Sequence, residues 1–171
     1  MLIGNKLNFA IECYHEPIAN DNKHVFGRVC VYVGGNTLGD INEPTCILNV
    51  LEEHLVMLLE WIDSQNNEEL IHLSDQDLFE LLDNALYLDE TGTLEEAKKD
   101  SEKYYKYDFL TNASEAFDGT KSFVISDGPN IRIMFTDISE QFHSSQIPKE
   151  VFHKVTTSFI NWVREEEQKM G

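Results

Sequence analysis

The sequence contains few cysteines, no long apolar run and few basic residues, and each shortage excludes a class of protein. Its 171 residues include three cysteines, four prolines and nine glycines. Cys13, Cys30 and Cys46 form no CxxC pair, so neither a disulfide framework nor a zinc site is expected. Cys13 and Cys30 could face each other across a hairpin, but packing of all three thiols as small apolar groups is the favoured interpretation.

No stretch approaches the roughly 18 consecutive apolar residues of a transmembrane helix. Residues 1–5 also lack the basic and apolar regions of a signal peptide. We therefore expect a cytoplasmic protein. With 42% apolar and 26% charged residues, the composition is that of a globular chain. The length predicts a single domain over residues 1–171.

Negative charge is concentrated in one part of the chain. There are 13 Lys and Arg against 31 Asp and Glu, a formal net charge of -18. Residues 60–102 carry 14 of these acids, with Lys98 and Lys99 as their only basic neighbours. Clustered negative charges repel one another and destabilise a compact fold. Their retention therefore favours a function that uses them, such as binding a positively charged partner. It argues against nucleic acid or an anionic membrane as a partner. The alternative is a solvated face that keeps the protein soluble.

The sequence carries no motif for catalysis or for a cofactor. Its six histidines form no HxH or HExxH pattern, and no GxGxxG, Walker or GxSxG sequence occurs. Asp75 and Asp77 lack the glycine and glutamate of an EF-hand, so helix-start carboxylates explain them better. With 31 acids, close carboxylate pairs are inevitable and none is informative. We expect no enzyme activity, no metal and no cofactor.

A hairpin and a buried helix are predicted in the first 63 residues. Residues 7–14 and 24–33 mix β-branched and aromatic residues with polar ones, and a turn-rich loop separates them. This pattern is typical of an antiparallel hairpin. Residues 49–63 have apolar side chains at helical spacing, with Asn49 as a candidate N-cap.

An acidic helical segment is expected at about residues 64–108. Leucines at helical spacing predict a helix over residues 74–88 with Ser74 as its N-cap. The opposite face carries Asp77, Glu80, Asn84 and Tyr87. A capping box that begins at Thr93 predicts a third helix to about Lys106.

A second hairpin and a final helix complete the pattern. Residues 121–126 and 130–136 flank the turn sequence 127–130, and alternation in the second strand predicts one buried and one wet face. A helix is expected from about Pro148, frayed near residues 165–167 because three glutamates there oppose the helix dipole. The order ββ-αα(α)-ββ-α predicts an α+β domain, with an antiparallel sheet from two hairpins packed against helices.

Several parts of the sequence resemble the bacterial immunity protein 42 family. They are residues 1–11 (MLIGNKLNFAI), the stretch from Gly27 to Gly35, residues 114–119 (SEAFDG), the strand 123–125 and the C-terminal Phe/Trp helix. These motifs are structural and skip much of residues 64–108. The resemblance implies a cognate antitoxin of a polymorphic toxin or contact-dependent inhibition system. Such a protein binds the C-terminal toxin domain of an effector and neutralises it in the cell that makes it.

The resemblance supplies no catalytic residue and no binding motif, so the predicted site rests on charge. A dense acidic face suits an immunity protein for a basic toxin such as a nuclease, because complementary charge speeds the encounter. We predict that the toxin contacts one acidic face with Tyr87 as the aromatic anchor. The predicted contact residues are Glu68, Glu69, Asp75, Asp77, Glu80, Asp83, Tyr87, Asp89 and Glu90.

Two other functions stay open from the residues alone. One is a small enzyme with a carboxylate-lined site. The other is an acidic nucleic-acid mimic or scaffold protein that occupies basic grooves. The protein is predicted to be a monomer or a weak homodimer. Phe9, Val29 or Tyr32 on an exposed sheet face could form a dimer, but ordinary core packing explains these residues equally well.

Overall fold

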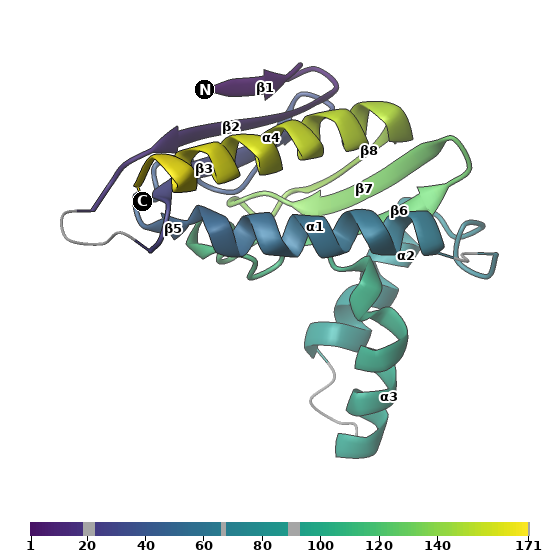
Figure 1. Cartoon of the computed structure of the whole chain (residues 1–171). Coiled ribbons are helices and arrows are strands. Elements are labelled where there is room, and N and C mark those ends of the chain that lie inside the picture. Colours follow the sequence, from purple (N-terminus) through teal and green to yellow (C-terminus); the bar gives the residue numbers. More distant parts are fainter. Residues whose placement is uncertain (19–22, 66–67, 89–92, 171) are drawn as a thin grey trace.

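The computed structural model describes residues 1–18, 23–65, 68–88 and 93–170. Its strands form two antiparallel sheets with helices packed against both, which confirms the α+β class (Figure 1). The first sheet has the order β1-β2-β3-β4 with β5 paired to β3: β1 (Leu2–Gly4), β2 (Phe9–His15), β3 (Phe26–Val33), β4 (Asn36–Leu38) and β5 (Cys46–Ile47). The second sheet is the meander β6 (Lys121–Asp127), β7 (Asn130–Thr136) and β8 (Phe142–Pro148).

Helices connect and cover these sheets. The α-helices are α1 (Leu48–Ser64), α2 (Asp75–Asp83), α3 (Leu94–Tyr104) and α4 (Lys149–Met170). The shorter turns are the π-helical η1 (Asn84–Leu88), which extends α2, and the 3-10 turns η2 (Tyr105–Tyr107) and η3 (Glu115–Phe117). All four predicted helices and both predicted hairpins are present.

The first hairpin places its cysteines on opposite faces of the sheet. Cys13 lies opposite Val29, and Cys30 lies opposite Glu12. Since side chains alternate along a strand, the two thiols project in opposite directions, and a contact between them across the hairpin is excluded. All three cysteines are buried and free, as the packing interpretation predicted.

One apolar core joins the two sheets. Figure 1 shows α1 and α4 lying side by side across one face of the strands, and the two helices contact each other. Their buried stripes meet inward-facing residues of both sheets. This core includes Phe9 and Ile11 of β2, Leu55 and Leu58 of α1, Ile133 and Phe135 of β7, and Phe152 and Phe159 of α4. The hairpins therefore share one interior although they belong to separate sheets.

The start of α1 differs from the prediction. Ile47 occupies the N-cap position and makes no side-chain cap hydrogen bond, so Asn49 is not the N-cap. The side-chain carbonyl of Asn49 instead accepts a hydrogen bond from the N–H of Val25 at 2.7 Å. The amide thus joins the first turn of α1 to the segment before β3. Its oxygen is used by the N–H of Val25, a residue distant in sequence, and not by an N–H of the helix itself.

The second sheet is covered on both faces. One face of β7 belongs to the core described above, while Met134 is fully buried on the other face with Phe123 and Ile125 of β6. Arg132 is only 7% exposed. The predicted wet face of β7 is therefore wrong, because α2 packs against it and η2 packs against the neighbouring strand β6.

The end of the chain is more ordered than predicted. Pro148 ends β8, and α4 begins one residue later. The helix continues to Met170, without the fraying expected near residues 165–167. Glu166 accepts hydrogen bonds from Lys169 Nζ at 2.7 Å and pairs with His15 Nδ1 at 2.8 Å. These contacts offset the unfavourable dipole interaction.

Candidate functional site

The acidic segment begins with a helix that packs against the second sheet. The hydroxyl of Ser74 accepts a hydrogen bond from the N–H of Asp77 at 3.1 Å, which confirms the predicted N-cap. The buried side of α2 is formed by Leu78, Phe79 and Leu82. Phe79 packs edge-on against Phe123 of β6, with ring centroids 5.3 Å apart. The sheet therefore holds α2 with its polar side outward.

The third helix projects away from the sheets. Thr93 and Glu96 form the predicted capping box, and no residue of α3 is buried. Figure 1 shows α3 extending below the sheets, beside η1, which it contacts. We call the unit formed by η1, α3 and η2 the arm. Because no residue of α3 is fully buried and Tyr104 packs only partly against the apolar cluster of α2 and β6, its helical state rests mainly on local interactions and on its contact with η1.

Four of the predicted contact residues are exposed. Glu68 and Glu69 lie in the loop before α2, and Asp77 and Glu80 lie on its outer side. We call these four the acidic surface. The leucine stripe of α2 faces the sheet, so the helical pattern correctly predicted the outward position of Asp77 and Glu80.

Asp75 and Asp83 are neutralised by basic residues of the second sheet. Asp75 Oδ1 lies 3.2 Å from Arg132 Nη1, and Asp83 Oδ1 lies 3.2 Å from Lys121 Nζ. The side chain of Asp83 is 14% exposed. These two acids contribute less to the outward field than the four of the acidic surface, because a cation lies beside each.

Tyr87 does not face outward with Asp77 and Glu80, as predicted. It is half-buried, and its hydroxyl donates a hydrogen bond to Asp108. The ammonium group of Lys121 lies 3.7 Å from the centroid of the Tyr87 ring. The π-helical turn η1 replaces regular helix at this position and changes the direction of the side chain. The prediction of Tyr87 as the anchor of an exposed face is therefore wrong.

The partner of Tyr87 is a buried carboxyl group. Asp108 is 2% exposed, and burial raises its pKa to about 6, although hydrogen bonds from Tyr87 and Thr111 oppose the shift. Burial also raises the pKa of Tyr87, and the bond to Asp108 adds to that effect. The pair is a structural support at the base of the arm. Asp89 and Glu90, the remaining predicted contacts, lie outside the described residues.

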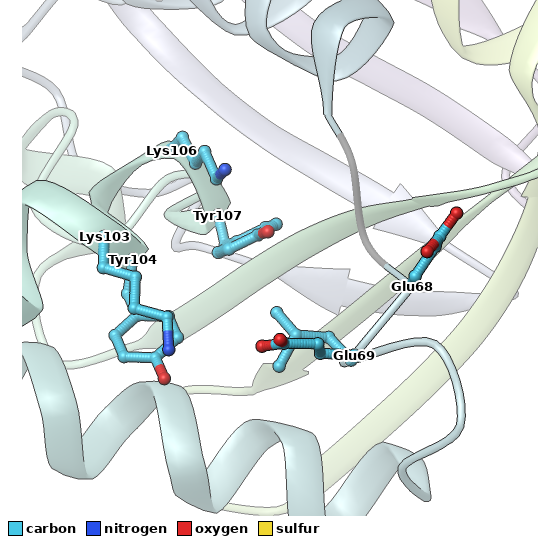
Figure 2. A pocket seen from close by; sticks show the side chains of 7 residues that line it. Glu68, Glu69, Lys103, Tyr104, Lys106 and Tyr107 are labelled. Carbon is cyan, nitrogen blue, oxygen red and sulfur yellow. The ribbon is translucent and has the colours of Figure 1, made fainter.

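A pocket of about 260 Å³ lies beside the acidic surface, between the loop before α2 and the end of α3 (Figure 2). Its lining residues are Glu68, Glu69, Leu70, Lys103, Tyr104, Lys106 and Tyr107. Five of them were not predicted as site residues: Leu70, and four that lie within residues 103–107. The signal for those four was the run KYYKY at 103–107, which interleaves basic and aromatic residues.

The outer face of the first sheet carries a second, larger groove of about 710 Å³. Glu12 on this face accepts hydrogen bonds from Lys6 Nζ at 2.5 Å and from two tyrosine hydroxyls. The bond from Lys6 comes first among the causes that hold the pKa of Glu12 at about 2. Arg28 pairs with Glu16 at 2.8 Å. Since its acids have basic partners, this face lacks the acidic excess of the α2 side.

The comparison with protein families shows to which family this chain belongs. The family model for immunity protein 42 matches residues 1–162. The chain belongs to this family. The matched span includes the acidic helical segment, which the motifs quoted from the sequence largely skip.

The fold of this immunity protein 42 member is similar to that of CdiI from Burkholderia dolosa AUO158, seen in a crystal structure. The TM-score is 0.63 at 17% sequence identity, and the match covers 94% of this chain and 99% of that chain. At this identity the similarity establishes the fold. A search among curated proteins gives no significant match.

In this immunity protein 42 member, the described residues contain no group of three or more His, Cys, Asp or Glu side chains arranged to hold a metal ion. Within the same residues, no helix has both the length and the apolar character needed to cross a bilayer.

Proposed function

We propose that this protein is a cytoplasmic immunity protein that binds the C-terminal toxin domain of a cognate effector and neutralises it without catalysis. The observation that carries the proposal is the immunity protein 42 match over residues 1–162. The similarity of fold to a protein described as CdiI supports it. The proposed unit is a monomer or a weak homodimer.

We further propose that the toxin domain is basic, such as a nuclease, and that it contacts the acidic surface. Glu68 and Glu69, in the loop before α2, and Asp77 and Glu80, on α2 itself, are all exposed. Charges act together when they lie within the screening length, which is about 8 Å at physiological salt. A cluster of this kind accelerates the encounter with a basic partner and disfavours partners of like charge.

The other predicted contacts have different parts in this proposal. Asp75 and Asp83 lie at the edge of the interface, where their ion pairs with Arg132 and Lys121 are already made. Asp89 and Glu90 follow η1 in the sequence and stay in the proposed contact set. Tyr87 leaves it, because its hydroxyl and ring are engaged inside the protein.

The test is isothermal titration calorimetry with the toxin domain encoded immediately upstream of this protein's gene, at low and at high salt. We expect one-to-one binding that weakens as salt rises, because clustered charges are screened. Absence of binding at either salt would contradict the cognate pairing. Equally strong, salt-sensitive binding to unrelated basic proteins would favour a general mimic of nucleic acid over an immunity protein.

Charge reversal then tests the surface. The double substitution Asp77→Lys with Glu80→Lys should lower the affinity more than tenfold and reduce the salt dependence. The matched control is Glu53→Lys with Glu165→Lys, which makes the same change in net charge at exposed positions of α1 and α4. An equal loss in the two variants would show that net charge, and not this surface, governs binding.

A further inference from the structure

The pocket near the base of the arm already holds a positive charge on an aromatic ring. Lys103 Nζ lies 4.7 Å from the centroid of the Tyr104 ring, within the range of a cation–π contact. Figure 2 shows the carboxylate of Glu69 turned toward Lys103 and Tyr104, while Glu68 points away from them. The ring of Tyr104 therefore already carries one cation of the chain itself, with the carboxylate of Glu69 turned toward it. A second cation of the lining, Lys106 Nζ, lies 5.1 Å from the centroid of the Tyr107 ring.

The charge of Lys103 responds to these neighbours. A hydrogen bond to Tyr104 is the largest cause that raises the pKa of Lys103, and the charges of Glu69 and Asp100 add to it. The pocket thus favours the protonated, cationic form of its occupant.

Another cation that makes stronger contacts with the pocket can nevertheless displace Lys103. Lys103 is exposed, and it lies in the last turn of α3, a helix without buried residues. Its contact is made by a flexible side chain, and an ammonium ion in water is strongly hydrated. An arginine guanidinium is planar and more weakly hydrated, stacks on aromatic rings and pairs with a carboxylate through two hydrogen bonds.

The walls of the pocket are suited to a flat group. Tyr107 is 3% exposed and forms a fixed side of the pocket, and its ring centroid lies 6.5 Å from that of Tyr104. Leu70 is 8% exposed and adds apolar surface to the lining. A guanidinium over Tyr104 would therefore have a carboxylate at its edge and an apolar floor.

We propose that this pocket accepts an arginine side chain of the toxin domain, whose guanidinium lies on Tyr104, pairs with Glu69 and displaces Lys103. The inference rests on the proposed function for the source of the arginine, which is the toxin domain. The affinity of the pocket for a guanidinium depends only on the residues of this chain. The acidic surface governs how fast the partners meet, and the pocket governs how slowly they separate.

The first test uses the free protein and a small ligand. N-acetyl-arginine amide is titrated into the isotope-labelled protein and followed by NMR, with N-acetyl-citrulline amide as the neutral control of similar shape. We expect saturable shifts confined to Glu69, Leu70, Tyr104 and Tyr107 with the arginine ligand and none with the citrulline ligand. Shifts spread evenly over all exposed acids, or identical shifts with both ligands, would overturn the proposal.

Substitutions then separate the pocket from general charge effects. Lys103→Met should tighten arginine binding because it removes the competing cation, whereas Lys99→Met, an equal change in net charge elsewhere on α3, should have a smaller effect. Tyr104→Leu should weaken binding about two- to fivefold, the range expected for one exposed cation–π contact. Glu69→Gln should weaken it as well. Equal behaviour of the Lys103 and Lys99 variants would overturn the proposal.

The toxin domain supplies the last measurement. Dissociation of the complex should be faster for Glu69→Gln and slower for Lys103→Met. If the wild-type protein does not bind the toxin domain, the proposed function fails, while the arginine titration still decides the pocket. If the toxin domain binds and neither variant alters its dissociation rate, the pocket proposal fails and the proposed function stands.

Discussion

The hydroxyl of Tyr87 in η1 donates a hydrogen bond to the carboxylate of Asp108, which is only 2% exposed. Asp108 also forms an isolated β-bridge with Phe123 of β6. Lys121, two residues earlier on β6, covers the ring of Tyr87. The bond therefore fastens the base of the arm to the second sheet.

Loss of the Tyr87 hydroxyl should destabilise the protein. In Tyr87→Phe the buried Asp108 loses one of its donors, and we expect the free energy of unfolding at pH 7 to fall by about 1–3 kcal/mol. Urea denaturation followed by circular dichroism measures the change. Tyr105→Phe, at a residue 48% exposed, serves as the control and should stay within about 0.5 kcal/mol of the wild type. An equal result for the two variants would contradict the role given to the bond.

Asp108 should make the folded state relatively more stable as the pH falls. Its pKa is about 6 in the folded protein and 3.8 ordinarily, so the folded state binds more protons between these values. On lowering the pH from 7 to 4.5, this group should add about 2 kcal/mol of stability.

The measurement for Asp108 is urea denaturation of the wild type and of Asp108→Asn at both pH values. The variant keeps an acceptor for Tyr87 but cannot titrate. The difference in the free energy of unfolding between the two proteins should therefore change by about 2 kcal/mol between pH 7 and 4.5. Other carboxylates affect both proteins alike. Parallel pH profiles would show that Asp108 does not titrate in this window.

Gly27 should not tolerate a side chain. A Cβ at this position would lie 2.0 Å from the carbonyl oxygen of Tyr14 and 2.8 Å from Leu48 Cδ1. We expect Gly27→Ala to cost about 3 kcal/mol or more, because the β2–β3 pairing must move. Gly119→Ala, at a φ of 78° with nothing within 4 Å of the new Cβ, should cost only about 1 kcal/mol. Thermal denaturation compares them, and similar losses would argue against the steric explanation.

The capping box should stabilise α3 locally. Thr93→Ala removes the cap and should cost about 1 kcal/mol within the helix. Since α3 has no buried residue, we expect amide hydrogen exchange across residues 94–104 to accelerate about fivefold with an unchanged midpoint of thermal unfolding. Thr157→Ala, on the exposed side of α4, is the control. A large drop in the unfolding midpoint would mean that the arm unfolds together with the core.

The three thiols should be unreactive in the native protein. Burial raises the pKa of Cys13 to about 12 and that of Cys30 to about 11, and it raises the pKa of Cys46 as well. Because the thiolate is the reactive form, Ellman's reagent should find no rapidly reacting thiol at pH 8 and three after unfolding in urea. Rapid reaction of one thiol in the folded protein would show that its strand opens.

Much of the fold follows from local patterns in the sequence. The period-2 and helical spacings predicted both hairpins and all four helices, and Ser74 and Thr93 act as the caps that their spacing indicates. Four further strands, β1, β4, β5 and β8, went unpredicted. Three of them have two or three residues, and β8 contains the polar run HSSQ, so they become strands because a neighbour pairs with them.

The candidate site was predicted in part. The exposed positions of Asp77 and Glu80 follow from the leucine stripe beside them, which must face the interior. The pairing of Asp75 and Asp83 did not follow, because Arg132 and Lys121 come from a distant part of the sequence. The pocket also escaped prediction, since it joins Glu69 in the loop before α2 to Tyr104 at the end of α3.

The sequence by itself therefore determined the positions of the two hairpins and the four helices, the caps at Ser74 and Thr93, the concentration of negative charge and the resemblance to the immunity protein 42 family. These depend on residue type and on spacing within one segment. Only the tertiary structure decided that Tyr87 turns inward, that both faces of β7 are buried and that Asp75 and Asp83 form ion pairs with basic residues. Those outcomes depend on which segments, distant in sequence, pack against each other. The burial of apolar surface over the whole chain determines that packing.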